Sequence, residues 1–63
     1  MSPLPVEVLA QVRENIKIAE AGHKELMTAI NEARLAGIDV TDQVKEAETL
    51  KAQIRQLKLV YGR

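Results

Sequence analysis

Apolar side chains recur along the first half of the chain at alternating steps of three and four residues. This spacing keeps them on one face of an α-helix and is typical of the a and d positions of a coiled coil or helical bundle. The stripe has a histidine as its one ionisable member and consists of Leu9, Val12, Ile16, Ala19, His23, Leu26, Ile30 and Ala33. The same steps return nearer the C-terminus at Ala47, Leu50, Ile54, Leu57 and Tyr61. The sequence therefore predicts two amphipathic helices.

The stretch AGIDVTD separates the two stripes and predicts a tight turn. Gly37 suits the left-handed backbone position that follows many helices, and Ile38 can contact the helix just before it. Residues that commonly cap the start of a helix come next, and the sequence does not choose among Asp39, Thr41 and Asp42. We expect an all-α fold with one domain over residues 1–63, an antiparallel two-helix hairpin with a long helix over about 5–36 and a shorter helix over about 40–61.

The composition excludes several classes of function. The chain has nine basic and nine acidic side chains and no cysteine, so it has no disulfides, no cysteine-bound metal and no net charge to attract a polyanion from a distance. A helical hairpin offers no cleft that excludes water, and we therefore expect no catalytic residue, no cofactor and no metal site. The chain has no run of about 18 apolar residues and no signal-peptide pattern at its start, so we expect a cytoplasmic protein that does not enter a membrane.

The small size of the chain favours self-association. A chain of this length buries only about 60% of its unfolded surface, and this one has a single tyrosine and no larger aromatic anchor. Small proteins without disulfides or metal often gain stability by oligomerising. We expect a homodimer or higher oligomer, most simply a four-helix bundle, in which the core seam consists of Ile16, His23, Leu26, Ile30, Leu50, Ile54, Leu57 and Tyr61.

The unequal lengths of the two helices predict an unpaired arm. Folding the chain about residue 38 places Tyr61 beside Ile16 and Ile54 beside His23. The residues before about Ile16 then have no partner within the chain, although they are apolar on one face. We expect a second subunit or a protein partner to cover this arm together with two apolar residues at the end of the second helix. The predicted interface consists of Val6, Val8, Leu9, Val12, Leu59 and Val60.

Gly22 and His23 stand in the middle of the first predicted helix, where glycine is a weak helix former. A histidine can be a metal ligand, a general base or a pH switch. Its nearest neighbours on the same helix face are Glu20 and Met27, which with His23 do not make a ligand set. We therefore interpret His23 as a packed or half-buried seam residue, and Gly22 as a position that lets a partner helix approach closely.

Lys51, Arg55 and Lys58 form a basic row on the second helix, at steps of four and three residues. Such a row can hold phosphates, which makes a small nucleic-acid-binding regulator the alternative function. The helix dipole also favours basic residues near a helix C-terminus, and this is the simpler explanation of the row. A phage accessory or virion component is a further alternative, because small hairpins without cysteine are common among such proteins. We favour a non-enzymatic protein–protein interaction module that self-associates.

Overall fold

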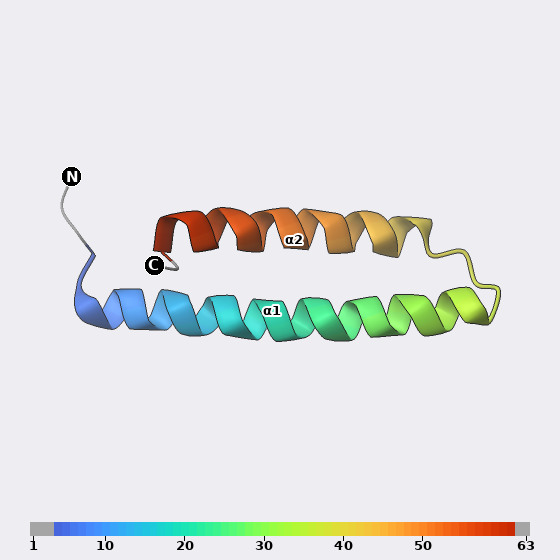
Figure 1. Ribbon diagram of the computed structural model, residues 1–63, viewed down its shortest axis with the longest axis horizontal. Helices are drawn as coiled ribbons and strands as arrows, with labels where there is room; N and C mark the ends of the chain where they lie inside the picture. Colours follow the sequence, from blue (N-terminus) through green and yellow to red (C-terminus); the bar gives the residue numbers. More distant parts are fainter. Residues whose placement is uncertain (1–3, 62–63) are drawn as a thin grey trace.

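The computed structural model describes residues 4–61, and these residues form two helices joined by a short turn (Figure 1). Helix α1 spans Val6–Leu35 and helix α2 spans Thr41–Tyr61. The helices run antiparallel and contact each other, while the N-terminal end of α1 extends beyond the end of α2 (Figure 1). The prediction of an all-α, two-helix hairpin is confirmed, with helix bounds within one residue of those expected.

The turn begins with a helix C-cap built around Gly37, which has a φ of +80°. The Gly37 N–H donates to the carbonyl of Arg34 at 3.0 Å, and the Ile38 N–H donates to the carbonyl of Ala33 at 2.9 Å. These two bonds make a Schellman motif, which needs a residue that tolerates a left-handed backbone at the glycine position. The prediction for Gly37 is confirmed, whereas the side chain of Ile38 is largely exposed.

Asp39 supplies the side chain that caps the start of α2. Its Oδ1 accepts a hydrogen bond from the Thr41 N–H at 3.0 Å and another from the Thr41 hydroxyl at 2.6 Å. Both bonds favour the ionised carboxylate and hold the pKa of Asp39 below its ordinary value. The bond from the Val44 N–H to the Val40 carbonyl then begins the helical ladder of α2. Of the three candidate capping residues, Asp39 therefore fills this role.

The core lies in the seam between the helices and is thickest near the turn. Ile30, Val40 and Ala47 form a buried cluster, and the partly buried side chains of Leu26, Ala33 and Val44 pack against it. Two isoleucines, Ile16 and Ile54, are buried farther along the seam. Of the predicted core residues, those that are half-buried are His23, Leu26, Leu50 and Tyr61.

Two residues differ from the sequence-based prediction of the core. Val40 lies in the turn, outside both apolar stripes, yet it is buried because it packs against Ile30 and Ala47. Leu57 was expected in the core seam but is 38% exposed. Its helical position, three residues after the buried Ile54, places it at the edge of the seam and not at its centre.

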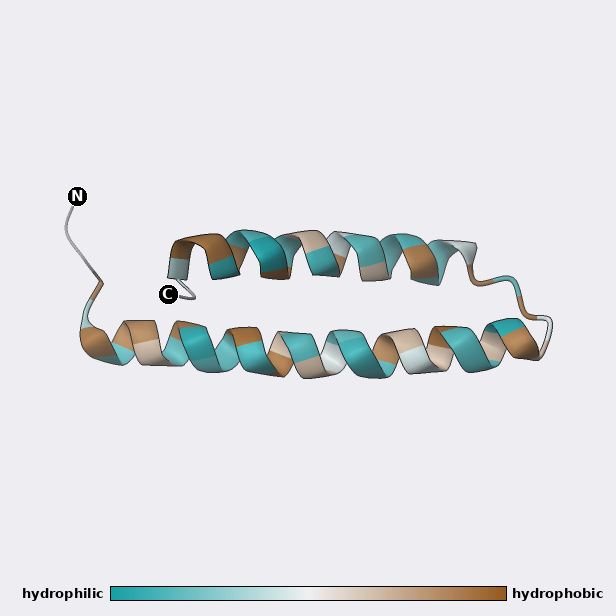
Figure 2. Cartoon of the chain, viewed as in Figure 1, coloured by the Kyte–Doolittle hydropathy of each residue, from teal (hydrophilic) through white to brown (hydrophobic). Residues whose placement is uncertain are grey.

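The hairpin is a thin rod. Its principal extents are 50 × 17 × 14 Å, and its radius of gyration of 14.9 Å exceeds the value of about 11 Å expected for a compact domain of this length. Hydrophobic residues are distributed along both helices, including the first turns of α1, which lie beyond α2 (Figure 2). Within residues 4–61, neither helix combines the length and the apolar character needed to cross a membrane.

Candidate functional site

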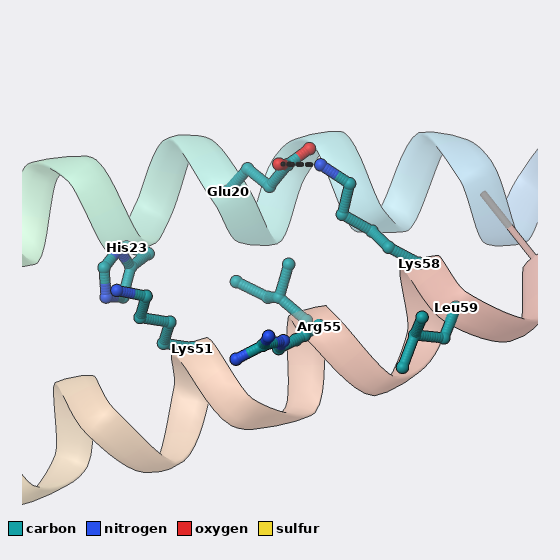
Figure 3. Close-up of a pocket in the computed structure, with 7 residues that line it drawn as sticks. Glu20, His23, Lys51, Arg55, Lys58 and Leu59 are labelled. Atoms are coloured by element: carbon teal, nitrogen blue, oxygen red, sulfur yellow. Dashed lines mark hydrogen bonds and ion pairs between the residues drawn. The ribbon is translucent and has the colours of Figure 1, made fainter.

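A groove runs between the helices on one side of the hairpin and gathers charged side chains. It has a volume of about 510 Å³, and Figure 3 shows side chains from both helices at its edges. We call it the charged groove, and its lining consists of Glu20, His23, Lys51, Ile54, Arg55, Lys58 and Leu59. The predicted neighbours His23 and Ile54 thus lie in the same part of the seam, and the whole basic row of α2 lines one groove.

An ion pair between the helices crosses the charged groove. Lys58 Nζ donates to Glu20 Oε2 at 3.0 Å, and the two side chains are 53% and 43% exposed (Figure 3). The three residues of the basic row therefore differ in their ion pairing, because Lys58 has an acidic partner. Lys51 and Arg55 form no ion pair with any residue in the described part of the chain.

His23 is half-buried and lies where two grooves meet. It lines the charged groove beside Ile54, and it also lines an adjoining groove that includes Met27 and Lys51. Figure 3 shows the side chain of Lys51 reaching toward the His23 ring. Over residues 4–61, the structure brings together no three His, Asp or Glu side chains that could hold a metal ion.

The other side of the hairpin carries several apolar and small side chains. Each residue of a helix is rotated about 100° around the axis from the one before it. The residue just before a seam position and the residue just after it therefore point to opposite sides of the hairpin. Relative to the seam, the charged residues of the groove all lie on one side. The opposite side carries Glu46, four residues before Leu50, and six uncharged residues that we call the uncharged face: Ile18, Gly22, Leu26, Ala29, Leu50 and Leu57.

The uncharged face is open in this structure. Ile18 is 61% exposed, and Leu26 and Leu50 are only half-buried although they flank the core. A Cβ added at Gly22 would meet nothing within 4 Å, so α2 does not approach this glycine. The expectation that Gly22 allows a close helix contact is therefore not met between α1 and α2.

The base of the arm of α1 contacts the end of α2. Arg13 Nε donates to the carbonyl of Tyr61 at 3.2 Å, so a long side chain about one turn before Ile16 contacts the end of α2. Two residues of the predicted interface, Leu9 and Val12, are half-buried. Val6 and Val8 remain exposed.

The two apolar residues predicted for the interface at the end of α2 point to different places. Leu59 is 64% exposed and lines the charged groove. Val60 is also exposed, and the helical rotation of one residue directs it away from that groove. Leu59 therefore belongs to the charged groove and not to the uncharged face.

Comparison of the chain with protein-family models, with curated proteins and with solved structures gives no match. The fold defines the protein as an all-α hairpin of two helices. Its candidate functional sites are the uncharged face and the charged groove, which lie on opposite sides of the same seam.

Proposed function

We propose that the protein is a non-enzymatic assembly module that associates with a second copy of itself through the uncharged face. The observation that carries this proposal is the surface that the single hairpin leaves exposed. The chain exposes 5292 Å², whereas a compact monomer of its 7.0 kDa mass exposes about 4,000 Å². The excess is roughly 1,200 Å², distributed over the whole rod, and is larger than the ~800 Å² that each partner buries in a standard protein interface.

The distribution of charge favours the uncharged face as the interface. Interface cores are depleted of charged residues, and the six members of this face are uncharged, with Glu46 beside Leu50 at its edge. Covering it would complete the burial of Leu26, which packs against the core cluster, and of Leu50, which is also only half-buried. Full burial of a leucine contributes about 1.5–3 kcal/mol relative to full exposure, so several such residues together give a substantial driving force.

The shape of the uncharged face also suits a second copy. Gly22 and Ala29 are one heptad apart, and their small side chains leave room for a helix to approach α1 closely. In a two-fold symmetric dimer each hairpin offers the same face, so the larger Ile18 and Leu57 of one copy can pack over the small residues of the other. Two hairpins arranged in this way make a four-helix bundle.

The arm of α1 extends the same surface. Val8 precedes Leu26 by 18 residues, which is five helical turns, so the two side chains lie in line along α1. Val8 is exposed in the hairpin, and it lies five residues before Arg13, which contacts the end of α2. We therefore assign Val8 to the same contact, while Val6 lies on a different side of the helix.

The proposal is tested by two substitutions of exposed leucines on α2. Leu57→Glu puts a charge on the uncharged face, and Leu59→Glu puts one in the charged groove. Light scattering of wild type at micromolar concentration should give twice the 7.0 kDa chain mass. We expect Leu57→Glu to lower that mass to one chain and Leu59→Glu to preserve it. A wild-type mass of one chain, or equal effects of both substitutions, would contradict the proposal.

A further inference from the structure

We propose that the charged groove is a binding site for a phosphate group, held by Lys51 and Arg55 beside His23. This inference concerns the opposite side of the hairpin from the uncharged face, so it does not depend on self-association. A dimer formed through the uncharged face would leave the groove open on each copy.

The position of the cations is the first support. Lys51 and Arg55 are four residues apart on α2, so they lie on one side of the helix and about 6 Å apart along its axis. Both line the charged groove, which His23 lines from α1 (Figure 3). A neutral imidazole can donate one ring N–H, a lysine donates three and a guanidinium donates five. Donors from both helices therefore open into one groove.

The pattern of ion pairing identifies which cations are available. Glu20 is engaged by Lys58 at 3.0 Å, and that pair carries no net charge. Lys51 and Arg55 have no acidic partner within hydrogen-bonding distance among the described residues. Glu48 lines one adjoining groove with both Lys51 and Arg55 and a second with Lys51, and its charge opposes an anion there without being paired to either cation.

The charge of the groove matches a phosphate better than a carboxylate. A phosphate monoester carries about −1.5 to −2 charges at neutral pH, which balances two cations, and a carboxylate carries one. Lysine and arginine both bind phosphate oxygens through charge-assisted hydrogen bonds. Ile54 and Leu59 give the groove an apolar part that can contact the remainder of the ligand. The same phosphate chemistry can come from a small phosphorylated molecule or from a nucleic-acid backbone.

The backbone gives no assistance at this position. Anions are favoured at helix N-termini, where free N–H groups point outward, but Lys51 and Arg55 stand in the middle and C-terminal half of α2. The attraction must come from the side chains alone. Binding should therefore depend strongly on each cation, and it should weaken steeply as the salt concentration rises.

His23 is the only histidine of the chain, so its imidazole resonances report on the groove without overlap. We would titrate the full chain with inorganic pyrophosphate and, separately, with a single-stranded oligothymidylate, holding ionic strength constant with sodium chloride. A saturable shift of the His23 resonances with either probe is expected. Saturation by pyrophosphate identifies a small phosphorylated ligand, and saturation by the oligonucleotide alone identifies a nucleic-acid backbone.

Substitutions separate a specific site from general attraction. Lys51→Gln and Arg55→Gln should each weaken binding roughly tenfold, the value of one lost hydrogen bond to a charged group. Glu48→Gln should strengthen binding, and Glu20→Gln should do the same by releasing Lys58. Circular dichroism confirms that each variant keeps its helices. No saturable shift with either probe, an equal shift with acetate, or unchanged affinity in Lys51→Gln and Arg55→Gln would overturn the proposal.

Discussion

Lys58 of α2 and Glu20 of α1 form an ion pair of 3.0 Å that joins residues 38 positions apart in the sequence. The pair and the bond from Arg13 to the carbonyl of Tyr61 show which parts of α1 and α2 lie opposite each other. Because this register also places His23 beside Ile54, it determines which side chains share the charged groove.

The energetic contribution of this ion pair should be small despite its geometry. Both partners are about half exposed, and exposed ion pairs contribute 0 to about 1 kcal/mol because water and salt screen them. A double-mutant cycle of Glu20→Gln and Lys58→Gln should give a coupling energy below about 1 kcal/mol, measured from urea unfolding. A coupling several times larger would show that the pair is buried in an assembly.

Substitution of the most buried side chain should have a much larger effect. Ile30 is 2% exposed and lies at the centre of the core cluster, whereas Leu35 on the same helix is 90% exposed. Ile30→Ala should cost about 2–5 kcal/mol through lost burial and a new cavity, which is a large part of the stability of so small a protein. Leu35→Ala is the matched control and should change the free energy of unfolding by less than about 0.5 kcal/mol.

Gly22→Ala should act in opposite directions on the helix and on the assembly. Nothing lies within 4 Å of a Cβ at this position, so alanine should stabilise α1 by about 1 kcal/mol in the dissociated chain. In the proposed dimer the added methyl group would meet the facing helix and weaken association. We expect a higher unfolding midpoint at low concentration together with a weaker dimer, measured by sedimentation. If Gly22→Ala raised the unfolding midpoint and left the mass of the dimer unchanged, Gly22 would not lie in the interface.

The cap of α2 predicts a defined acid dependence. Hydrogen bonds from Thr41 lower the pKa of Asp39 in the folded state below its ordinary value of 3.8, so the unfolded chain binds the proton more readily. The stabilisation is therefore complete above the unfolded pKa and is lost as the pH falls through the lower, folded-state value. Asn at this position keeps an acceptor oxygen but does not titrate.

Urea midpoints of wild type, Asp39→Asn and Asp39→Ala test this cap at about pH 6 and about pH 3. At the higher pH the Ala variant should be the least stable of the three. At the lower pH the advantage of wild type over Asp39→Asn should shrink, because only the wild-type side chain is protonated. An unchanged difference between these two proteins at both pH values would show that the charge of Asp39 has no part in the cap.

The sequence was sufficient for the hairpin because its signals are local. Steps of three and four residues define each helix face, and Gly37 marks the turn by the backbone conformation it adopts. Val40 was missed because it belongs to neither stripe. Its burial depends on how the turn brings it against Ile30 and Ala47, which no periodicity within one helix encodes.

The candidate sites needed the register between the helices. The basic row of Lys51, Arg55 and Lys58 follows from spacing along α2, but its pairing with Glu20 depends on α1. Folding the sequence about residue 38 placed Ile54 beside His23, and both side chains line the charged groove. The uncharged face was missed because its members come from both helices.

Contacts between two copies of the chain test the central proposal most directly. In a mixture of isotopically labelled and unlabelled protein, isotope-filtered NOEs arise only between different molecules. We expect intermolecular NOEs among the methyl groups of Ile18, Leu26 and Leu57, with none from Leu59. Intermolecular NOEs that involve Leu59 instead, or no intermolecular NOEs at concentrations where the protein is folded, would contradict association through the uncharged face.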